Sequence, residues 1–204
     1  CGEILLDGED LLKMPFRKSA LKMAVVGQEN EIPFDFSVEE IVAMGRSPHK
    51  KLFNSDTEED HRMVHHALEH LGIEDLAKRN YRHLSGGEKQ RVLISRAIAQ
   101  ESDFLILDEP TAVLTPQETE VLFSVLRSLK EDGHSIILIS HRLAEIMEIT
   151  DKITVLRSGK KIDTLATAKC TEALLSQLMI GRQIRTDKIE YAEKPRPERV
   201  LDVR

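Results

Sequence analysis

This sequence of 204 residues has only two cysteines, and it lacks long apolar runs and an excess of positive charge. Cys1 and Cys170 are too few for a disulfide framework, so a reducing, cytoplasmic setting is expected. The longest apolar runs, such as residues 136–139, fall far short of the roughly 20 residues that span a bilayer. A net charge of −6 argues against nucleic-acid binding as the main function. What is present is 41% hydrophobic residues, enough for a sizeable globular core.

The stretch at residues 84–90, LSGGEKQ, is the most informative part of the chain. Two glycines follow Ser85 directly and an apolar pattern at helical spacing comes after them, which predicts a helix that begins at Ser85. The two glycines leave the first turn of this helix without bulky side chains, so its free backbone N–H groups are accessible to a phosphate. Ser85 and Glu88 also form a capping box, which any helix can use to start. From these residues alone, a phosphate site and a simple helix cap remain equally open.

A buried strand and two carboxylates follow at residues 104–110, FLILDEP. Four continuous apolar residues are typical of a parallel strand that helices cover on both faces. Asp108 and Glu109 then stand at the carboxyl end of that strand, where open α/β sheets bind ligands. A second apolar strand, residues 135–140, ends at His141 on the same predicted edge. The alternation of strands and helices predicts a parallel α/β core.

Helices are predicted for the stretch from about residue 35 to residue 82. Capping boxes that begin at Ser37 and Ser55 open two of them. The second helix carries two histidine pairs at i,i+4 spacing, which zinc can use: His61 with His65, and His66 with His70. The pairs point in different directions and lack further ligands, so a solvated polar face is the stronger interpretation.

The remaining elements follow from shorter signals. Residues 21–26 are expected to form a strand that leads to Gln28, which taken alone is an ordinary loop residue. A hairpin turn is predicted at residues 7–8, and Thr115 is predicted to start a helix with Pro at its first position. Another hairpin and a last helix, which Gly181 should end, are expected before the chain becomes charged and proline-bearing.

In combination, these motifs resemble the nucleotide-binding domain of an ABC transporter. LSGGEKQ matches that family's signature motif and FLILDEP its Walker B motif. His141 is similar to the switch histidine, and Gln28 falls where the family has its Q-loop glutamine. The resemblance covers about residues 2–181, and the four motifs stand in the family's order and spacing.

The resemblance implies an α/β fold with a three-layer P-loop NTPase core, a helical subdomain at about residues 35–82 and a remnant antiparallel β subdomain. Residues 1–181 would be a partial nucleotide-binding domain and residues 182–199 a linker. Residues 200–204 would begin a second nucleotide-binding domain.

The resemblance also implies roles for single residues. Asp108 would help to hold Mg²⁺, and Glu109 would act as the general base that polarises the attacking water. Gln28 would contact both the metal and the water, and His141 would bind the γ-phosphate of ATP. The signature residues would face ATP held by a partner subunit: Ser85, Gly86, Gly87 and Gln90.

Two departures from the family pattern concern the site. The phosphate-binding loop G-x-x-x-x-G-K-[ST] occurs nowhere in the 204 residues. The family places it upstream of the segment that residues 2–6 resemble, so the core is expected to lack that strand and helix and to bind ATP weakly by itself. Thr115 stands where the family usually carries Asp in the loop after Walker B, which bears on communication across a dimer.

The two halves of the chain resemble different branches of the family. Residues 33–46 are similar to ferric-siderophore, haem and cobalamin importers. Residues 112–118, 139–149 and 179–182 are similar to tandem sugar or nucleoside importers. We hypothesise that the chain is a composite joined near Walker B, and the transported substrate stays open between these classes.

The function implied is that of an ATP-binding and ATP-hydrolysing subunit of an ABC importer, which energises transport through nucleotide-driven dimerisation. Its partners would be a second nucleotide-binding domain and a transmembrane permease, at the cytoplasmic face of the membrane. One alternative is a catalytically silent fragment that only docks on such partners. Another is a soluble ABC ATPase of DNA repair or translation, which the compact helical insert argues against.

Overall fold

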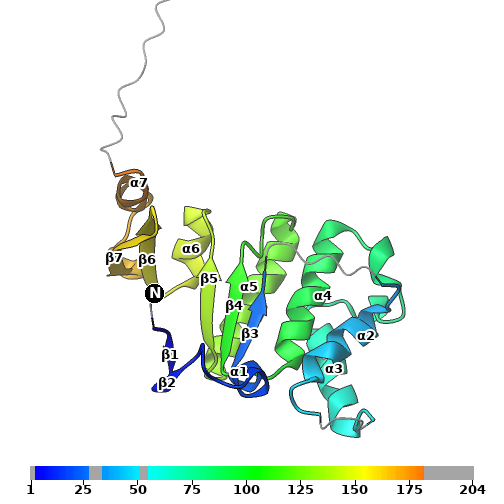
Figure 1. The fold of residues 1–204 in the computed structure, drawn as a ribbon. Helices are drawn as coiled ribbons and strands as arrows, with labels where there is room; N and C mark the ends of the chain where they lie inside the picture. Colours follow the sequence, from blue (N-terminus) through cyan, green and yellow to red (C-terminus); the bar gives the residue numbers. More distant parts are fainter. Residues whose placement is uncertain (1–2, 28–33, 51–54, 182–204) are drawn as a thin grey trace, which may run out of the picture. The chain divides into compact units, whose positions relative to one another are not determined.

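The computed structural model describes residues 3–27, 34–50 and 55–181 (Figure 1). The chain divides between Asp151 and Lys152 into two compact units. The first unit contains the parallel sheet and helices α1 to α6, and the second contains the hairpin β6–β7 and helix α7. Gln28, the expected linker and the expected final strand lie outside the described residues.

A parallel sheet forms the centre of the first unit, as the sequence predicts. Its strands are β3 (Met23–Val26), β4 (Phe104–Asp108) and β5 (Ser135–Ile139), hydrogen-bonded in that order. In register, Val25 pairs with Ile106 and Ile106 with Ile137. The carboxyl ends of β4 and β5 therefore meet at one edge of the sheet.

The prediction that the strand at residues 104–107 is buried on both faces is wrong for the described part of the chain, because Phe104 and Ile106 are only partly buried. Leu105 and Leu107 are buried in a core shared with α4 (Gly86–Ala99) and α5 (Pro116–Glu131). On the opposite face, Ile137 and Ile139 are each 49% exposed. The burial of these strands alternates because the described helices pack against one face only.

The strand predicted for residues 21–26 begins two residues later, at Met23. Its first two positions belong to a helix that the sequence analysis missed, α1 (Phe16–Lys22), which follows Pro15. Gln100, at the end of α4, fixes this change of conformation. Its amide Nε2 donates to the carbonyl of Ala20 at 2.5 Å and to that of Met23 at 2.9 Å.

Helices and 3₁₀ turns, joined by short loops, make up the described residues 34–50 and 55–83, as predicted for this stretch. They are α2 (Val38–Ala43), α3 (Glu58–His70) and three short 3₁₀ turns at Met44–Arg46, Glu74–Leu76 and Tyr81–His83. The capping box at Ser37 is confirmed. The one predicted at Ser55 is wrong, because Thr57 caps α3 together with Asp60. Thr57 Oγ1 accepts from the Asp60 N–H at 3.2 Å, and Asp60 accepts from the Thr57 N–H at 3.0 Å.

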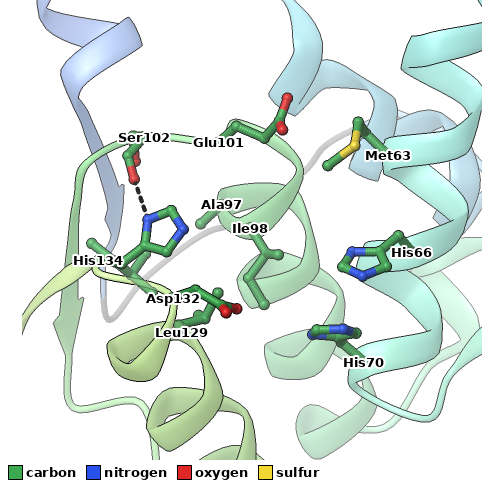
Figure 2. A pocket seen from close by; sticks show the side chains of 11 residues that line it. Met63, His66, His70, Ala97, Ile98, Glu101, Ser102, Leu129, Asp132 and His134 are labelled. Carbon is green, nitrogen blue, oxygen red and sulfur yellow. Dashed lines mark hydrogen bonds between the residues drawn. The ribbon is translucent and has the colours of Figure 1, made fainter.

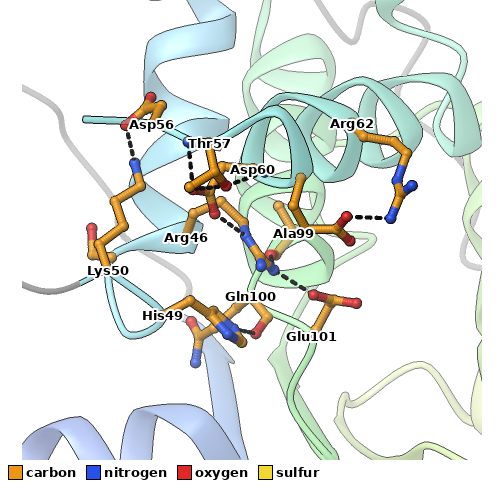
Figure 3. A network of polar contacts seen from close by, with 12 residues as sticks. Arg46, His49, Lys50, Asp56, Thr57, Asp60, Arg62, Ala99, Gln100 and Glu101 are labelled. Atoms are coloured by element: carbon orange, nitrogen blue, oxygen red, sulfur yellow. Dashed lines mark hydrogen bonds and ion pairs between the residues drawn. The ribbon is translucent and has the colours of Figure 1, made fainter. Parts of the chain in front are cut away.

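A buried ion pair decides which residue caps α3 (Figure 3). Arg46 and Asp60 are 3% and 5% exposed, and Arg46 Nε donates to Asp60 Oδ1 at 3.0 Å. Arg46 Nη1 also donates to the carbonyl of Ala99 at 2.7 Å and to Glu101 Oε2 at 2.6 Å. Burial alone would raise the pKa of Asp60, but hydrogen bonds from Thr57 and Arg46 outweigh it and hold that pKa below its usual range. The network joins the turn after α2, the start of α3 and the end of α4.

Gly45 brings the turn after α2 into contact with the backbone of α4. A Cβ at Gly45 would lie 2.1 Å from the carbonyl oxygen of Arg96. We expect Gly45→Ala to lower the free energy of unfolding by about 1–3 kcal/mol, because one of the two backbones must move. Urea unfolding of the whole chain measures the loss. Gly86→Ala is the control, since its Cβ would meet only Val113 Cβ at 3.7 Å. Equal losses in the two variants would contradict the close approach at Gly45.

The other elements agree with their sequence signals. In the first unit, β1 (Leu5–Leu6) and β2 (Glu9–Asp10) pair around the Asp7-Gly8 turn, and α6 (Leu143–Ile149) follows β5. In the second unit, β6 (Lys152–Arg157) and β7 (Lys160–Ala166) form the predicted hairpin, and α7 (Glu172–Ile180) ends at Gly181 in the left-handed conformation. Among the described residues, no helix has the length and apolar character needed to cross a bilayer.

Candidate functional site

The structure brings Glu109 and His141 together at the carboxyl edge of the sheet. The backbone N–H of Glu109 donates to the carbonyl of Ile139 at 2.9 Å, which extends the β4–β5 pairing by one residue. His141 Nδ1 then lies 2.7 Å from Glu109 Oε1. The Glu109 side chain is 16% exposed and the His141 side chain 72%, so the imidazole lies over the carboxylate on its solvent side.

Glu109 has an unusual backbone and an unusual carboxylate. Its φ is 49°, in the left-handed region that residues with a Cβ rarely adopt, and such strain clusters at functional sites. Its second oxygen, Oε2, is buried and has no hydrogen-bond partner among the described residues. Because a buried carboxylate oxygen normally has a partner, this acceptor fits a bound water or a metal-bound water.

The acidic residues here also fit Mg²⁺ when the metal arrives with a phosphate ligand. Asp108 is half-buried at the end of β4, beside Glu109. Within the described ranges, no group of three or more histidine, cysteine or acidic side chains is arranged to hold a metal by itself. Mg²⁺ usually keeps several waters and binds through one or two carboxylates plus substrate phosphates, so a fuller protein cage is not required. Gln28, the other predicted ligand, lies outside the described residues.

The signature stretch forms the predicted helix start. Ser85 is the N-cap of α4: its hydroxyl accepts from the Glu88 N–H at 3.3 Å, and Glu88 Oε2 accepts from the Ser85 N–H at 2.7 Å. Ser85 and Gly86 are exposed, whereas Gly87 and Gln90 are buried. The first turn therefore presents the serine and the first glycine outward, and Gln90 lies in the packing of the helix.

The segment from Glu109 to the first turn of α5 makes two polar contacts that the sequence analysis missed. Thr111, 1% exposed, donates its hydroxyl to Glu145 Oε2 on α6 at 2.6 Å. Glu118, in the first turn of α5, lies 3.2 Å from Arg91 Nη2 on α4. No periodic pattern marks these four residues in the sequence. The described residues show no direct hydrogen bond or ion pair between the signature turn and the Glu109–His141 pair, so this segment is what connects them.

The histidines of α3 divide between solvent and a cavity of about 310 Å³ (Figure 2). His61 and His65 are exposed, as predicted. His66 and His70 line the cavity, with their ring centroids 4.0 Å apart and the ring planes tilted by 46°. Burial, followed by the charge of His66, lowers the pKa of His70. His134 lines it too, with Nδ1 2.9 Å from the carbonyl oxygen of Ser102. The cavity lies where β4 and β5 begin, at the end of the sheet away from Glu109.

Comparison with known proteins identifies the family. A family model described as "ABC transporter" matches residues 1–112, just over half of the chain. The chain therefore belongs to the ABC transporter family. The α/β class predicted from the sequence is confirmed by solved ABC structures. An inward-facing, metal-chelate type ABC transporter matches with a TM-score of 0.71 at 30% identity, over 78% of this chain and 64% of that chain. The dimeric, post-hydrolysis state of the ATP-binding cassette MJ0796, bound to ADP and Pi, shares the fold with a TM-score of 0.71 at 24% identity, over 81% and 73%.

Curated relatives are import proteins. The ribose import ATP-binding protein RbsA of Lactococcus lactis subsp. lactis is 39% identical over 184 residues, which are 90% of this chain and 37% of the relative. The nucleoside import ATP-binding protein NupA of Lactococcus lactis subsp. cremoris is 33% identical over 100% of this chain and 40% of its own length. The chain thus spans about two fifths of the length of the curated relatives it matches.

Proposed function

We propose that this chain is part of the ATP-binding and ATP-hydrolysing subunit of an ABC importer, bound peripherally to the cytoplasmic face of the membrane. The Glu109–His141 pair carries the proposal: a strained, half-buried carboxylate with one unpartnered oxygen stands at the carboxyl edge of a parallel sheet. The names of the relatives favour a sugar or nucleoside as the cargo. A second nucleotide-binding domain and a permease are the proposed partners.

Glu109 acts as the general base in this proposal. Its Oε2 would accept a proton from the attacking water, while Oε1 stays bound to His141 Nδ1. That contact orients the ring, and a protonated ring then offers Nε2–H to a phosphate oxygen. Asp108, with Gln28, would hold Mg²⁺, which neutralises phosphate charge when it is bound. Because the base and its orienting histidine belong to adjacent strands, the sheet itself sets their separation.

The first turn of α4 acts on a different nucleotide. Its free N–H groups, the Ser85 hydroxyl and the exposed Gly86 form a surface for phosphate oxygens, and the helix dipole favours a negative charge there. In the proposed head-to-tail dimer, this surface meets ATP held by the partner domain. The chain therefore contributes to two half-sites, one with Glu109 and one with Ser85.

Ser85→Ala tests the signature half-site, with Ser37→Ala as its matched control. Both serines are N-caps with complete capping boxes, so each substitution costs about 1 kcal/mol of stability. The chain is mixed with an ABC domain that retains a phosphate-binding loop but whose own signature serine is replaced. We expect ATP-dependent association and hydrolysis with the unchanged chain. In Ser85→Ala the affinity of association should fall about 10- to 100-fold, which corresponds to the loss of one hydrogen bond to a charged group.

The control decides between chemistry and stability. Ser37→Ala should associate like the unchanged chain, because Ser37 begins α2 and its capping box with Glu40 accounts for its side-chain hydrogen bonds. Equal losses in both variants would assign the effect to helix capping and contradict the signature role.

The absence of G-x-x-x-x-G-K-[ST] from the 204 residues favours one competing function, a catalytically silent docking fragment. Measuring ATP turnover of the chain alone, and again with a family-type phosphate-binding loop and its strand and helix added before residue 2, separates the two. ATP turnover that appears only after the loop is added supports the ATPase function. Co-purification with a membrane permease distinguishes an importer subunit from a soluble ABC ATPase.

A further inference from the structure

We propose that Glu118 is a positioning residue that fixes the signature turn relative to the loop after Glu109. In this role it couples the two half-sites to which the chain contributes, so this second part of the inference rests on the proposed function. Glu118 lies in the first turn of α5, and the proposed chemistry of the two half-sites gives it no role.

The two carboxylate oxygens of Glu118 serve different elements. Oε2 accepts from the backbone N–H of Thr115 at 2.8 Å and from the Thr115 hydroxyl at 3.0 Å, which completes the capping box of α5. Oε1 lies 3.2 Å from Arg91 Nη2 on α4. The side chains of Arg91 and Glu118 are 18% and 21% exposed, so the pair is largely shielded from water.

The same carboxylate packs against the signature glycines. A Cβ at Gly87 would lie 2.8 Å from both oxygens of Glu118. A Cβ at Gly86 would lie 3.7 Å from Val113 Cβ, in the same loop. Gly87 is therefore glycine for a packing reason as well as for an open helix start: its bare backbone lets Glu118 reach Arg91.

The other end of the 109–118 segment is attached to the strand and helix that flank His141. Glu109 binds Ile139 through its backbone and His141 through its side chain, and Thr111 binds Glu145 on α6. One short segment thus contacts the general-base pair at its start and the signature helix at its end. The path from one half-site to the other therefore consists of the ten residues from 109 to 118 and the ion pair between Glu118 and Arg91.

Glu118 supplies the negative charge in the contact between this segment and the signature helix. It is the only acidic residue between positions 111 and 118, and Thr115 stands where the resembled family usually has Asp. On the other side, Arg91 donates from Nη1 to the carbonyl oxygens of Leu71 and Gly72 at 3.4 and 3.5 Å. The guanidinium is therefore held by α3 and α5 together, and Glu118 is its charged partner.

Glu118→Gln isolates this contact. Gln at the third helical position still completes a capping box, so the substitution removes the charge towards Arg91 and keeps the helix start. Glu120→Gln, on the same helix at an exposed position, makes the same change of charge and is the control. Both variants are made in the whole chain.

Hydrogen exchange of the amides of Glu88 and Lys89, which donate to the hydroxyl and the carbonyl of Ser85 at 3.3 and 2.9 Å, reports the stability of the signature turn without nucleotide and needs no ATPase activity. We expect about two- to fivefold faster exchange in Glu118→Gln and no change in Glu120→Gln, since a partly exposed ion pair contributes about 0.2–1 kcal/mol. Arg91→Gln should have the same effect, and the double variant should exchange no faster than either single variant. Exchange in Glu118→Gln that matches Glu120→Gln would overturn the positioning role.

The coupling is tested in the association assay with the partner domain described above. We expect Glu118→Gln to need about fivefold or more ATP for half-maximal association, within the usual range of coupling between sites. Unchanged ATP dependence, with faster exchange, would overturn the coupling and leave the positioning. If the unchanged chain does not associate at all, the proposed function fails, and the exchange result still decides the role of Glu118 as a positioning residue.

Discussion

Asp60→Asn is expected to lower the free energy of unfolding by about 3 kcal/mol. The substitution leaves the buried guanidinium of Arg46 without its buried carboxylate partner, and breaking a buried ion pair in this way costs about 3–5 kcal/mol. The lower end applies because Glu101, 42% exposed, still binds Arg46 Nη1. Asn also retains an oxygen that can accept from Thr57, so the loss reports charge more than capping.

Urea unfolding of the whole chain measures this loss, with Asp56→Asn as the control. Asp56 pairs with Lys50 at 2.6 Å, but its side chain is 39% exposed. Exposed pairs contribute about 0–1 kcal/mol, so the control should unfold close to the unchanged chain. A loss at Asp60 no larger than that at Asp56 would show that the Arg46 network does not stabilise the fold.

The pH dependence of stability should change with the same substitution. The pKa of Asp60 is lower in the folded chain than in the unfolded one, because hydrogen bonds from Thr57 and Arg46 outweigh burial. Its stabilising contribution is therefore fully present above about pH 4, the unfolded pKa, and is lost as the pH falls below that value. Between pH 6 and pH 3 the unchanged chain should lose more stability than Asp60→Asn. Parallel curves would contradict the depressed pKa.

Local signals predicted most of the capping boxes correctly, and the one wrong capping box has a tertiary cause. The capping boxes at Ser37, Ser85 and Thr115 involve residues three positions apart, so the sequence contains all the information they need. Near residue 57, two boxes compete, one from Ser55 and one from Thr57. Asp60 in the second box also binds Arg46, which the sequence pattern does not connect to it.

The boundaries of the strands and the burial of their faces also depend on residues that are distant in the sequence, so local patterns did not predict them. The helix α1 stops at Lys22, where Gln100 binds the carbonyls on both sides of the boundary, and no local pattern indicates that contact. Apolar runs indicated strands correctly, but a run cannot tell whether one face or both are covered. Ile137 belongs to such a run and is half exposed.

Sheet topology made the contact between Glu109 and His141 predictable. The other contacts were missed because they do not depend on the order of the strands. Glu109 and His141 end adjacent parallel strands, so their strand positions alone bring them to one edge. The contacts of Thr111 with Glu145 and of Arg91 with Glu118 join helices and loops whose packing no sequence period encodes. The role of Gln28 and the composite origin of the chain stay predictions.

Glu109→Gln is expected to slow ATP hydrolysis by about 10²- to 10⁴-fold, the usual contribution of a general base. The amide has nearly the shape of the carboxylate and still meets His141 through one terminal atom, but it cannot accept a proton from water. Binding of nucleotide depends on other groups, so ATP-dependent association should remain. The assay uses the chain with a family-type phosphate-binding loop and its strand and helix added before residue 2, because under the proposed function Glu109 would act on the nucleotide of its own half-site.

Comparison with Ser85→Ala separates the two half-sites to which this chain contributes. Loss of the base should abolish turnover and keep association, whereas loss of the signature hydroxyl should weaken association itself. Glu120→Gln, exposed and on α5, controls for the change of charge. Turnover by Glu109→Gln within threefold of the unchanged protein would remove Glu109 as the base. The strained φ of 49° and the buried, unpartnered Oε2 would then require a different explanation, and Asp108 would be the carboxylate to test next.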